Sequence, residues 1–254
     1  MTLLSYIYWK FCIKVLWEKT QRVWRRKRMV ADDKRIRIIT GHYGSGKTEF
    51  AVNYVKKLRE SVDGKVAIAD LDIVNVYFRS REKKEELEEK GIQVIASNLD
   101  TAVADVPAVS GAMTMPVINK EYQYVVDLGG NDVGTLVLGR IKPLLDHSEA
   151  DFFMVVNAYR PNTSTPEGII EQMENLEYAA GLKVTGFINN TNLVRETTAE
   201  CLLHGDEVLK EVTKRTGVPV KYVSYVRDVM TEEIPEGLSG ELFPMEFNMR
   251  KTWM

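Results

Sequence analysis

The feature that constrains this chain most is a glycine-rich stretch, GHYGSGKT, at residues 41–48. Its glycines allow successive backbone N–H groups to surround phosphate oxygens without hindrance from side chains. Lys47 is long enough to reach β- and γ-phosphates, and the hydroxyl of Thr48 suits the Mg²⁺ that bridges them. The spacing therefore predicts a P-loop, whose nucleotide contacts we expect from Gly41, Gly44, Ser45, Gly46, Lys47, Thr48 and Glu49.

The residues on either side of this loop support the prediction. Residues 36–40, IRIIT, form a β-branched run typical of a buried strand, and apolar residues recur at helical spacing from residue 50 to residue 62. Strand, glycine loop and helix thus follow one another in the order that a P-loop requires. Such a helix directs its unpaired N–H groups and the positive end of its dipole at the phosphates.

Strand and helix patterns alternate along the rest of the chain, which predicts an α/β fold with a mostly parallel sheet and helices on both faces. In such sheets ligands bind at the carboxyl ends of the strands. No assignment follows for residues 97–116, and the tail after residue 229 is expected to be irregular. The further strands are expected near 65–72, 92–96, 122–127, 151–157, 183–190 and 218–226, and the further helices near 80–90, 165–180 and 198–216.

Carboxylates end two of these predicted strands. Asp127 is placed to hold Mg²⁺ as a Walker B aspartate, and Gly130 in the sequence DLGG can bring a backbone N–H to the γ-phosphate. Of Asp70 and Asp72, we favour Asp72, which lies farther out, as the group that orients the attacking water or organises the Mg²⁺ shell. The predicted catalytic residues are therefore Lys47 and Asp72, and the predicted Mg²⁺ ligands are Thr48, Asp72 and Asp127. An ordinary strand-end aspartate before a turn is the alternative for Asp127.

The sequence GFINN ends another strand with Asn189 and Asn190, whose amides both donate and accept hydrogen bonds and therefore suit the edge of adenine. Capping of the chain by these asparagines is an equal alternative. A guanine-selecting N-K-x-D motif is absent, because the single Asn-Lys pair, at 119–120, continues with Glu-Tyr. ATP is thus favoured over GTP, with Mg²⁺ as its companion.

Charge is distributed unevenly along the 254 residues. Residues 1–28 contain eight Lys and Arg against one acid, and the remaining chain has 26 basic and 35 acidic residues, which argues against specific nucleic-acid binding. We interpret 1–28 as an amphipathic, aromatic helix on an anionic membrane or as a mis-assigned start before Met29. Residues 29–254 are then one P-loop ATPase domain, expected in the cytoplasm because the two cysteines suggest neither a disulfide framework nor a metal site.

With GHYGSGKTE, DLDIVNVYFRSRE, VVDLGG, NAYRP and GFINN in this order, the chain resembles the ParA/MinD/CobQ-like branch of P-loop ATPases, of the SIMIBI class, and a bacterial group of ParA-like ATP-binding proteins within it. The resemblance covers roughly residues 35–225. It implies phosphate and Mg²⁺ contacts at Lys47 and Thr48, a switch carboxylate at Asp72, Walker B at Asp127 and a base contact at Asn190.

One departure from that branch concerns the residue after the first P-loop glycine. ParA and MinD have a lysine there that reaches across an ATP-sandwiched dimer, and this chain has His42, so activation of that kind is in doubt although a homodimer remains open. We expect a slow ATPase that acts as a nucleotide-dependent switch on a protein partner. The alternatives are a binding module that does not hydrolyse ATP, and a small-molecule kinase or ligase in which Arg160 and residues 97–116 line an acceptor pocket.

Overall fold

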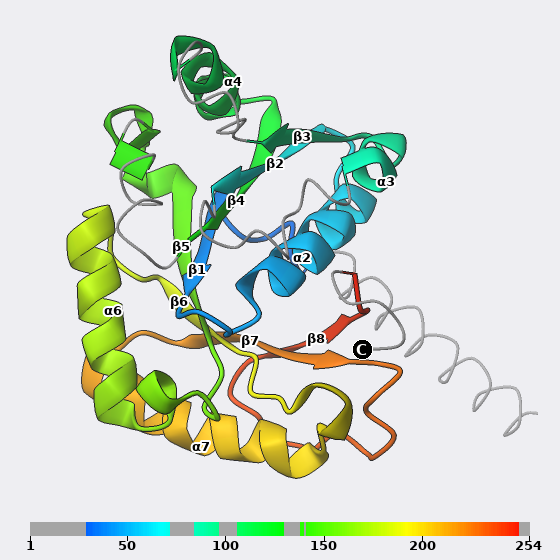
Figure 1. Ribbon diagram of the computed structural model, residues 1–254, viewed down its shortest axis with the longest axis vertical. Helices are drawn as coiled ribbons and strands as arrows, with labels where there is room; N and C mark the ends of the chain where they lie inside the picture. The colour runs from blue at the N-terminus through cyan, green and yellow to red at the C-terminus, as the bar shows by residue number, and fades with distance from the viewer. Residues whose placement is uncertain (1–28, 72–83, 97–105, 130–137, 140, 249–254) are drawn as a thin grey trace, which may run out of the picture.

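The computed structural model describes residues 29–71, 84–96, 106–129, 138–139 and 141–248. They form one parallel sheet in the order β3-β2-β4-β1-β5-β6-β7-β8, which confirms the predicted parallel α/β architecture. Figure 1 shows the strands side by side with the helices around them. The strands are β1 (Ile36–Gly41), β2 (Lys65–Leu71), β3 (Ile92–Ala96), β4 (Tyr122–Leu128), β5 (Ala150–Val156), β6 (Gly186–Asn189), β7 (Val220–Val226) and β8 (Glu241–Met245).

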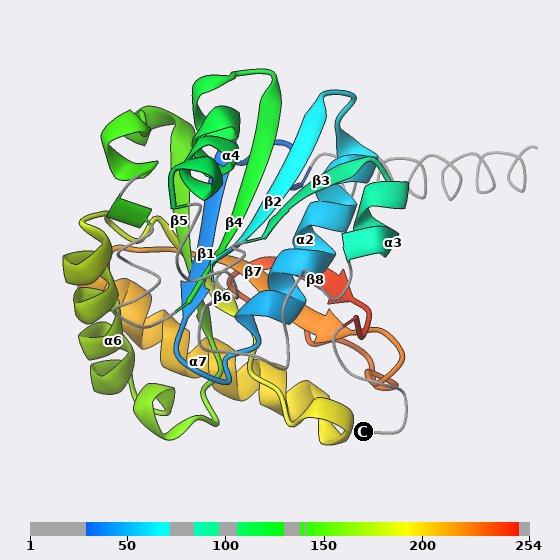
Figure 2. The ribbon, with the colours of Figure 1, turned by 45° about the horizontal axis from the view of Figure 1, so that its top comes forward.

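Helices cover both faces of the sheet, as predicted (Figures 1 and 2). One apolar cluster packs α2 and α3 on one face, and a second packs α4, α6 and α7 on the other. A fully buried Leu, Val or Phe side chain contributes roughly 1.5–3 kcal/mol, so these two layers account for most of the hydrophobic stabilisation. The helices are α2 (Lys47–Ser61), α3 (Lys84–Glu89), α4 (Val106–Ile118), α6 (Pro166–Ala180) and α7 (Ala199–Thr216), with short 3₁₀ turns η2 (Lys142–Leu144), η3 (His147–Glu149), η4 (Pro161–Thr163) and η5 (Val194–Glu196).

Local signals fix the ends of α6. The Thr165 hydroxyl accepts a hydrogen bond from the Gly168 N–H at 3.2 Å, and Gly181 ends the helix in the left-handed region at φ 61°. Threonine is favoured at a helix start because its hydroxyl accepts from a free N–H group, and glycine is favoured at a helix end because it adopts a left-handed backbone without strain. The helix therefore lies where its capping residues predict it.

Two segments differ from the sequence expectation. The stretch at 97–116 received no assignment, and α4 begins within it at residue 106. Apolar residues fill nearly every position of VPAVSGAMTMPVI, so no helical alternation could reveal this helix. The tail expected to be irregular contains β8, an edge strand of five residues that tolerates Pro244 because it has only one neighbour.

The aromatic side chains of the α2 face explain why β8 forms. The ring of Phe243 lies 4.8 Å from that of Phe50 and is fully buried beneath α2. Pairing with β7 lets the strand bury Phe243 and Met245 together, whereas its short sequence alone gives little strand signal. Tertiary packing thus decides this element.

Residues 1–28 lie outside the described part of the chain, so their interpretation as a membrane helix or as a mis-assigned start stays a prediction. The described chain begins at Met29, whose carbonyl accepts a hydrogen bond from the Tyr222 hydroxyl at 3.3 Å, and Val30 is buried. The segment from Met29 onward is thus packed into the domain. None of the helices within the described ranges is both long and apolar enough to cross a bilayer.

Candidate functional site

The glycine loop connects the end of β1 to the start of α2. Gly46 precedes the first helical residue at φ 86° and Gly44 lies at φ 75°, a left-handed backbone that glycine adopts without strain. The Ser45 N–H donates to the His42 carbonyl at 3.0 Å and closes the turn. No side chain caps α2, so the loop presents an uncapped helix N-terminus of the kind that binds anions.

Close packing explains two of the other glycine requirements. A Cβ at Gly41 would lie 2.5 Å from the carbonyl oxygen of Val155 on β5, and a Cβ at Gly46 would overlap the amide nitrogen of Asn190. A side chain at either position would displace β5 or β6 from the loop. The glycines therefore serve the seating of the loop on its neighbouring strands as well as its curvature.

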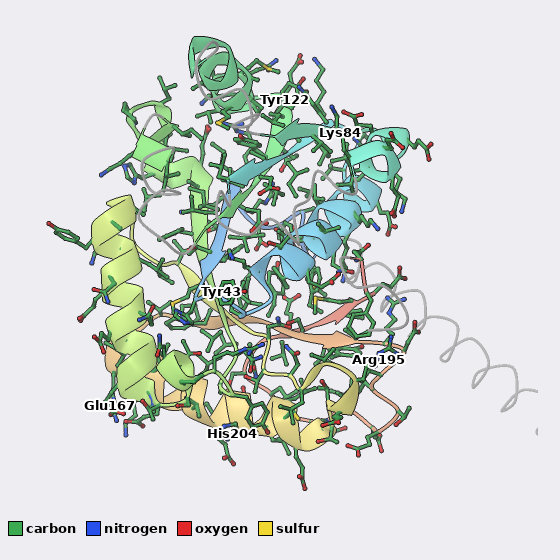
Figure 3. The ribbon with its side chains drawn as sticks, in the orientation of Figure 1. Tyr43, Lys84, Tyr122, Glu167, Arg195 and His204 are labelled. Atoms are coloured by element: carbon green, nitrogen blue, oxygen red, sulfur yellow. The ribbon has the colours of Figure 1, made fainter. Side chains whose placement is uncertain are left out.

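Lys47 and Thr48 open α2 and are both 5% exposed. Their place in the first turn brings an ammonium group and a hydroxyl to the end of the helix that carries the positive dipole. Tyr43, at the tip of the loop and labelled in Figure 3, is 71% exposed instead. The loop is thus rigid at its helix end and open at its tip.

Two carboxylates lie in one row across the sheet. Asp127 on β4 is in register with Ile39 of β1 and with Asp70 of β2. Each aspartate stands two positions beyond a residue of the α2-face core, Ile68 before Asp70 and Val125 before Asp127, so both side chains face α2. Neighbouring strands are ~4.8 Å apart, and both aspartates are almost completely buried.

This arrangement fits a bound Mg²⁺. Mg²⁺ is usually held by one or two carboxylates, a hydroxyl and the substrate's phosphates, with water completing the shell. Thr48, Asp127 and Asp70 offer the required oxygen donors, and a cation would offset the cost of two like charges on one buried face. The described residues hold no cluster of three or more His, Cys, Asp or Glu that would bind a metal without substrate.

Asn190 joins the loop to the strands beside it. Its amide nitrogen donates to the Ser45 carbonyl at 2.7 Å, and its amide oxygen accepts from the Ser224 hydroxyl at 2.8 Å. The side chain is 3% exposed, so it is held at the junction of the P-loop, β6 and β7. Asn189 faces the other way and donates to the Leu202 carbonyl at 3.1 Å, which gives it a structural role in α7 packing.

Arg160 reaches the P-loop from the turn after β5. Its Nε donates to the Gly44 carbonyl at 3.1 Å, and its Cζ lies 3.2 Å from where a Cβ at Gly44 would stand. In the same turn, the Asn162 amide is 3.2 Å from Nε2 of His42. The sequence NAYRP thus forms a support on the outer side of the glycine loop.

A cleft that is open to solvent lies beside the loop on the Asn190 side. Its polar residues come from the P-loop, the turn after β5, the loop after β6 and the end of β7, and its apolar residues come partly from Met245 and Phe247 near the C-terminus. The lining residues are Gly44, Gly46, Glu49, Arg160, Asn190, Asn192, Val194, Thr197, Ser224, Tyr225, Val226, Met245 and Phe247.

Several predicted site residues meet here and others cannot be placed. Lys47, Thr48, Asp127 and Asn190 converge on the carboxyl ends of β1, β4 and β6. Asp72 and Gly130 lie outside the described residues, so their roles stay predictions. Glu49, predicted as a nucleotide contact, lines the cleft while its Oε1 accepts the Asn248 N–H at 2.6 Å.

Asp70 is the residue that the sequence interpretation undervalued. The sequence favours Asp72 because it lies farther out, and the structure places Asp70 beside Asp127 on the P-loop face. The signal was present in the sequence, because Ile68 and Asp70 are two positions apart and side chains two apart share a face. Counting strand faces from the buried apolar residues would have identified it.

Comparison with known proteins supports the fold. No family model matches the sequence, and no curated protein matches it. Among solved structures, FtsY from Mycoplasma mycoides has a TM-score of 0.52 at 19% identity, over 74% of this chain and 59% of its own length. The cell division protein FtsY from Thermotoga maritima has a TM-score of 0.52 at 20% identity, over 74% and 60%.

The chain therefore spans about three-fifths of the length of these two FtsY proteins. Together with the strand order and the glycine loop, the likeness defines a protein with the α/β fold of P-loop NTPases. The finer placement in the ParA/MinD-like branch remains a matter of proposal.

Proposed function

We propose that this protein binds Mg-ATP at the P-loop and hydrolyses it slowly, as a ParA-like switch whose state governs contact with a protein partner in the cytoplasm. One observation carries the proposal. Lys47 and Thr48 stand at an uncapped helix N-terminus on the same face of the sheet as the buried pair Asp70 and Asp127. This is the arrangement of charges that a Mg-nucleoside triphosphate requires.

The chain's own residues supply positioning and charge. The P-loop amides and Lys47 would bind the β- and γ-phosphates and stabilise the charge that develops during phosphoryl transfer. Thr48 and Asp127 would hold Mg²⁺, which neutralises phosphate charge when bound. Asp72 would orient the attacking water, and Gly130 would respond to the presence of the γ-phosphate.

The surroundings of His42 favour slow turnover. In place of the cross-subunit lysine of ParA and MinD, His42 makes its contact within the same chain, to Asn162. No such lysine is then available to complete the site, so we expect full activity only with a partner. A preference for ATP over GTP agrees with the cleft, whose single acidic lining residue, Glu49, accepts the Asn248 N–H.

The test is phosphate release from Mg-ATP and from Mg-GTP by the full chain, with ADP and any acceptor product separated by chromatography. Asp72→Ala should keep ATP binding and lose phosphate release about 100-fold, because it removes only the group that orients water. Asp63→Ala, an exposed aspartate after α2, is the matched control and should behave as the unchanged protein.

Each other outcome supports a different function. Tight ATP binding without turnover, alone or with partners, would favour a binding module. Loss of ATP on addition of a metabolite would favour a kinase if the phosphoryl group stays on the acceptor, and a ligase if phosphate is released together with a new acceptor-derived product. If Asp72→Ala loses binding as strongly as turnover, the role given to Asp72 is wrong. Binding of the full chain to anionic vesicles, absent in residues 29–254, would support the membrane interpretation of residues 1–28.

A further inference from the structure

The NAYRP turn, residues 157–161, has no role in the phosphate and Mg²⁺ chemistry, yet several hydrogen bonds fix its conformation. The Asn157 carbonyl accepts from the Arg160 N–H at 3.0 Å and from the Thr163 hydroxyl at 2.8 Å. The Asn157 side chain accepts from the Tyr159 N–H at 3.0 Å and donates to the Asn192 carbonyl at 3.1 Å. These contacts fix the turn and join it to the loop after β6.

This turn holds the guanidinium of Arg160 in place beside the cleft. Arg160 Nε donates to the Gly44 carbonyl, and the guanidinium carbon Cζ of Arg160 packs against the loop at Gly44. The same side chain lines the cleft with Asn190 and Asn192, whereas Asp70 and Asp127 do not. Arg160 thus faces the side of the P-loop away from the carboxylates, where the charge of transfer would not develop.

Met245 and Phe247 line another part of the cleft. The residues beside Phe247 are hydrogen-bonded to α2. The Asn53 side chain accepts from the Glu246 N–H at 2.9 Å and donates to the Glu246 carbonyl at 3.0 Å. Glu49 accepts the Asn248 N–H at 2.6 Å. Phe247 therefore sits between two residues that are anchored to α2.

A cation–π contact between Arg195 and Phe247 lies beside the cleft. The guanidinium carbon of Arg195, on the loop after β6, lies 5.7 Å from the centre of the Phe247 ring (Arg195 is labelled in Figure 3). Such a contact links the loop after β6 to the C-terminal segment. The cleft is thus lined by the planar guanidinium of Arg160, the ring of Phe247 and apolar residues, together with amide and hydroxyl groups.

A flat heteroaromatic ring matches these boundaries. Its faces favour a planar guanidinium and aromatic or apolar side chains, and its edge favours amides and hydroxyls. We propose that Arg160 and Phe247 are the residues that hold the nucleobase, with Arg160 packed on the base and Phe247 closing the cleft around it. This inference rests on the proposed nucleotide function and adds to it the two residues that give the base its share of the affinity.

The test separates the base from the phosphates. Binding of Mg-ATP and of Mg-tripolyphosphate to the full chain is measured by titration calorimetry for Arg160→Ala, Phe247→Ala and Phe247→Leu. Loss of one stacking partner should raise the Kd for ATP about 10-fold in each alanine variant. The Kd for tripolyphosphate, which has no base, should stay within about twofold of the unchanged protein.

Two exposed residues supply matched controls. Arg215→Ala removes a guanidinium held by surface ion pairs with Glu167 and Glu211, and Tyr178→Ala removes an aromatic ring that is 92% exposed. Neither should change either Kd. Thermal unfolding shows whether Phe247→Ala folds, and Phe247→Leu keeps most of the apolar volume if it does not.

Every result decides the proposal. Equal weakening of ATP and tripolyphosphate by Arg160→Ala would make Arg160 a phosphate ligand or a support of the glycine loop and would overturn the proposal. Unchanged ATP binding in Arg160→Ala or in the folded Phe247 variants would also overturn it. If the unchanged protein binds tripolyphosphate as tightly as ATP, the base site is overturned while the P-loop stands. If it binds neither, the proposed function itself fails.

Discussion

Two buried polar clusters lie at opposite ends of the same sheet, and they are built differently. At the amino ends of the strands, the Asp33 carboxylate accepts hydrogen bonds from the hydroxyls of Tyr54, at 2.6 Å, and Tyr222, and lies 2.7 Å from the Lys221 ammonium. Arg37, fully buried, donates to the carbonyls of Val30 and Asp33. The protein's own groups thus pair with the Asp33 carboxylate and with most of the Arg37 guanidinium, and Arg37 Nε is left without a hydrogen-bond partner among the described residues.

At the carboxyl ends of the strands, the polar groups are arranged around a place for a bound ligand. The helix N-terminus at Lys47 has no side-chain cap, and the buried hydroxyl of Ser45 has no hydrogen-bond partner among the described residues. Asp70 and Asp127 lie side by side in register, which places like charges together. The difference teaches that burial of charge alone does not mark a functional site, and that the distinguishing feature here is the uncapped helix N-terminus beside the buried carboxylates.

The largest effect is expected at the P-loop cation. Lys47→Ala should abolish measurable ATP binding and lower phosphate release by about 1,000-fold, because the phosphates lose their principal positive charge. Phosphate release and calorimetry measure the two effects. Lys65→Ala, an exposed lysine paired with Glu121, is the control and should change neither quantity. Retained ATP affinity in Lys47→Ala would place the nucleotide elsewhere.

Asp127→Asn should lower phosphate release by about 100-fold and raise the Mg²⁺ concentration needed for half-maximal activity, since an amide is a poorer Mg²⁺ ligand. The folded state should be kept or stabilised, because one of two neighbouring buried charges is removed. A Mg²⁺ titration of activity beside thermal unfolding measures both. Marked destabilisation with unchanged Mg²⁺ dependence would make Asp127 a structural residue.

In the cluster at the amino ends of the strands, a substitution should lower stability and leave turnover unchanged. Asp33→Asn should lower the free energy of unfolding by about 3 kcal/mol, because it takes the charge out of a buried network and leaves its partners poorly paired. Turnover per folded molecule should not change. Urea unfolding and phosphate release at a permissive temperature give the two values. A large loss of turnover in folded Asp33→Asn protein would remove the distinction between the clusters.

The smallest effect concerns Tyr222 and pH. Burial, with Tyr54 and Asp33 nearby, raises the pKa of the Tyr222 phenol well above its ordinary value of about 10. Its contribution to stability is therefore complete below about pH 10 and is lost as the pH rises further, because the unfolded chain releases this proton first.

Tyr222→Phe should accordingly cost about 1.5 kcal/mol near pH 8, for the lost hydrogen bond to a carboxylate, and should weaken the loss of stability between about pH 10 and 12. Urea unfolding across this pH range measures it, with Tyr178→Phe at an exposed position as the control. An unchanged slope above pH 10 would contradict the raised pKa of Tyr222.

Much of the fold and the centre of the site could be predicted because their signals are local. The glycine loop, the buried strand before it and the helix after it occupy consecutive residues, and backbone sterics and helix periodicity act over that range. The same holds for the cap of α6 at Thr165 and for the position of Asp127 at a strand end. The parallel architecture followed from the alternation of these units.

The sequence by itself thus determined the phosphate loop and the order of the strands and helices other than α4 and β8, since those elements are specified by neighbouring residues. The tertiary structure alone decided that Asn190 binds the Ser45 carbonyl across 145 positions, that Arg160 binds Gly44 across 116 and that Asn248 binds Glu49 across 199. Such contacts leave no periodic trace, because they depend on which strands become neighbours in the sheet. The α2-facing pair Asp70 and Asp127, and β8 with Phe247 after it, became visible only when that order was known.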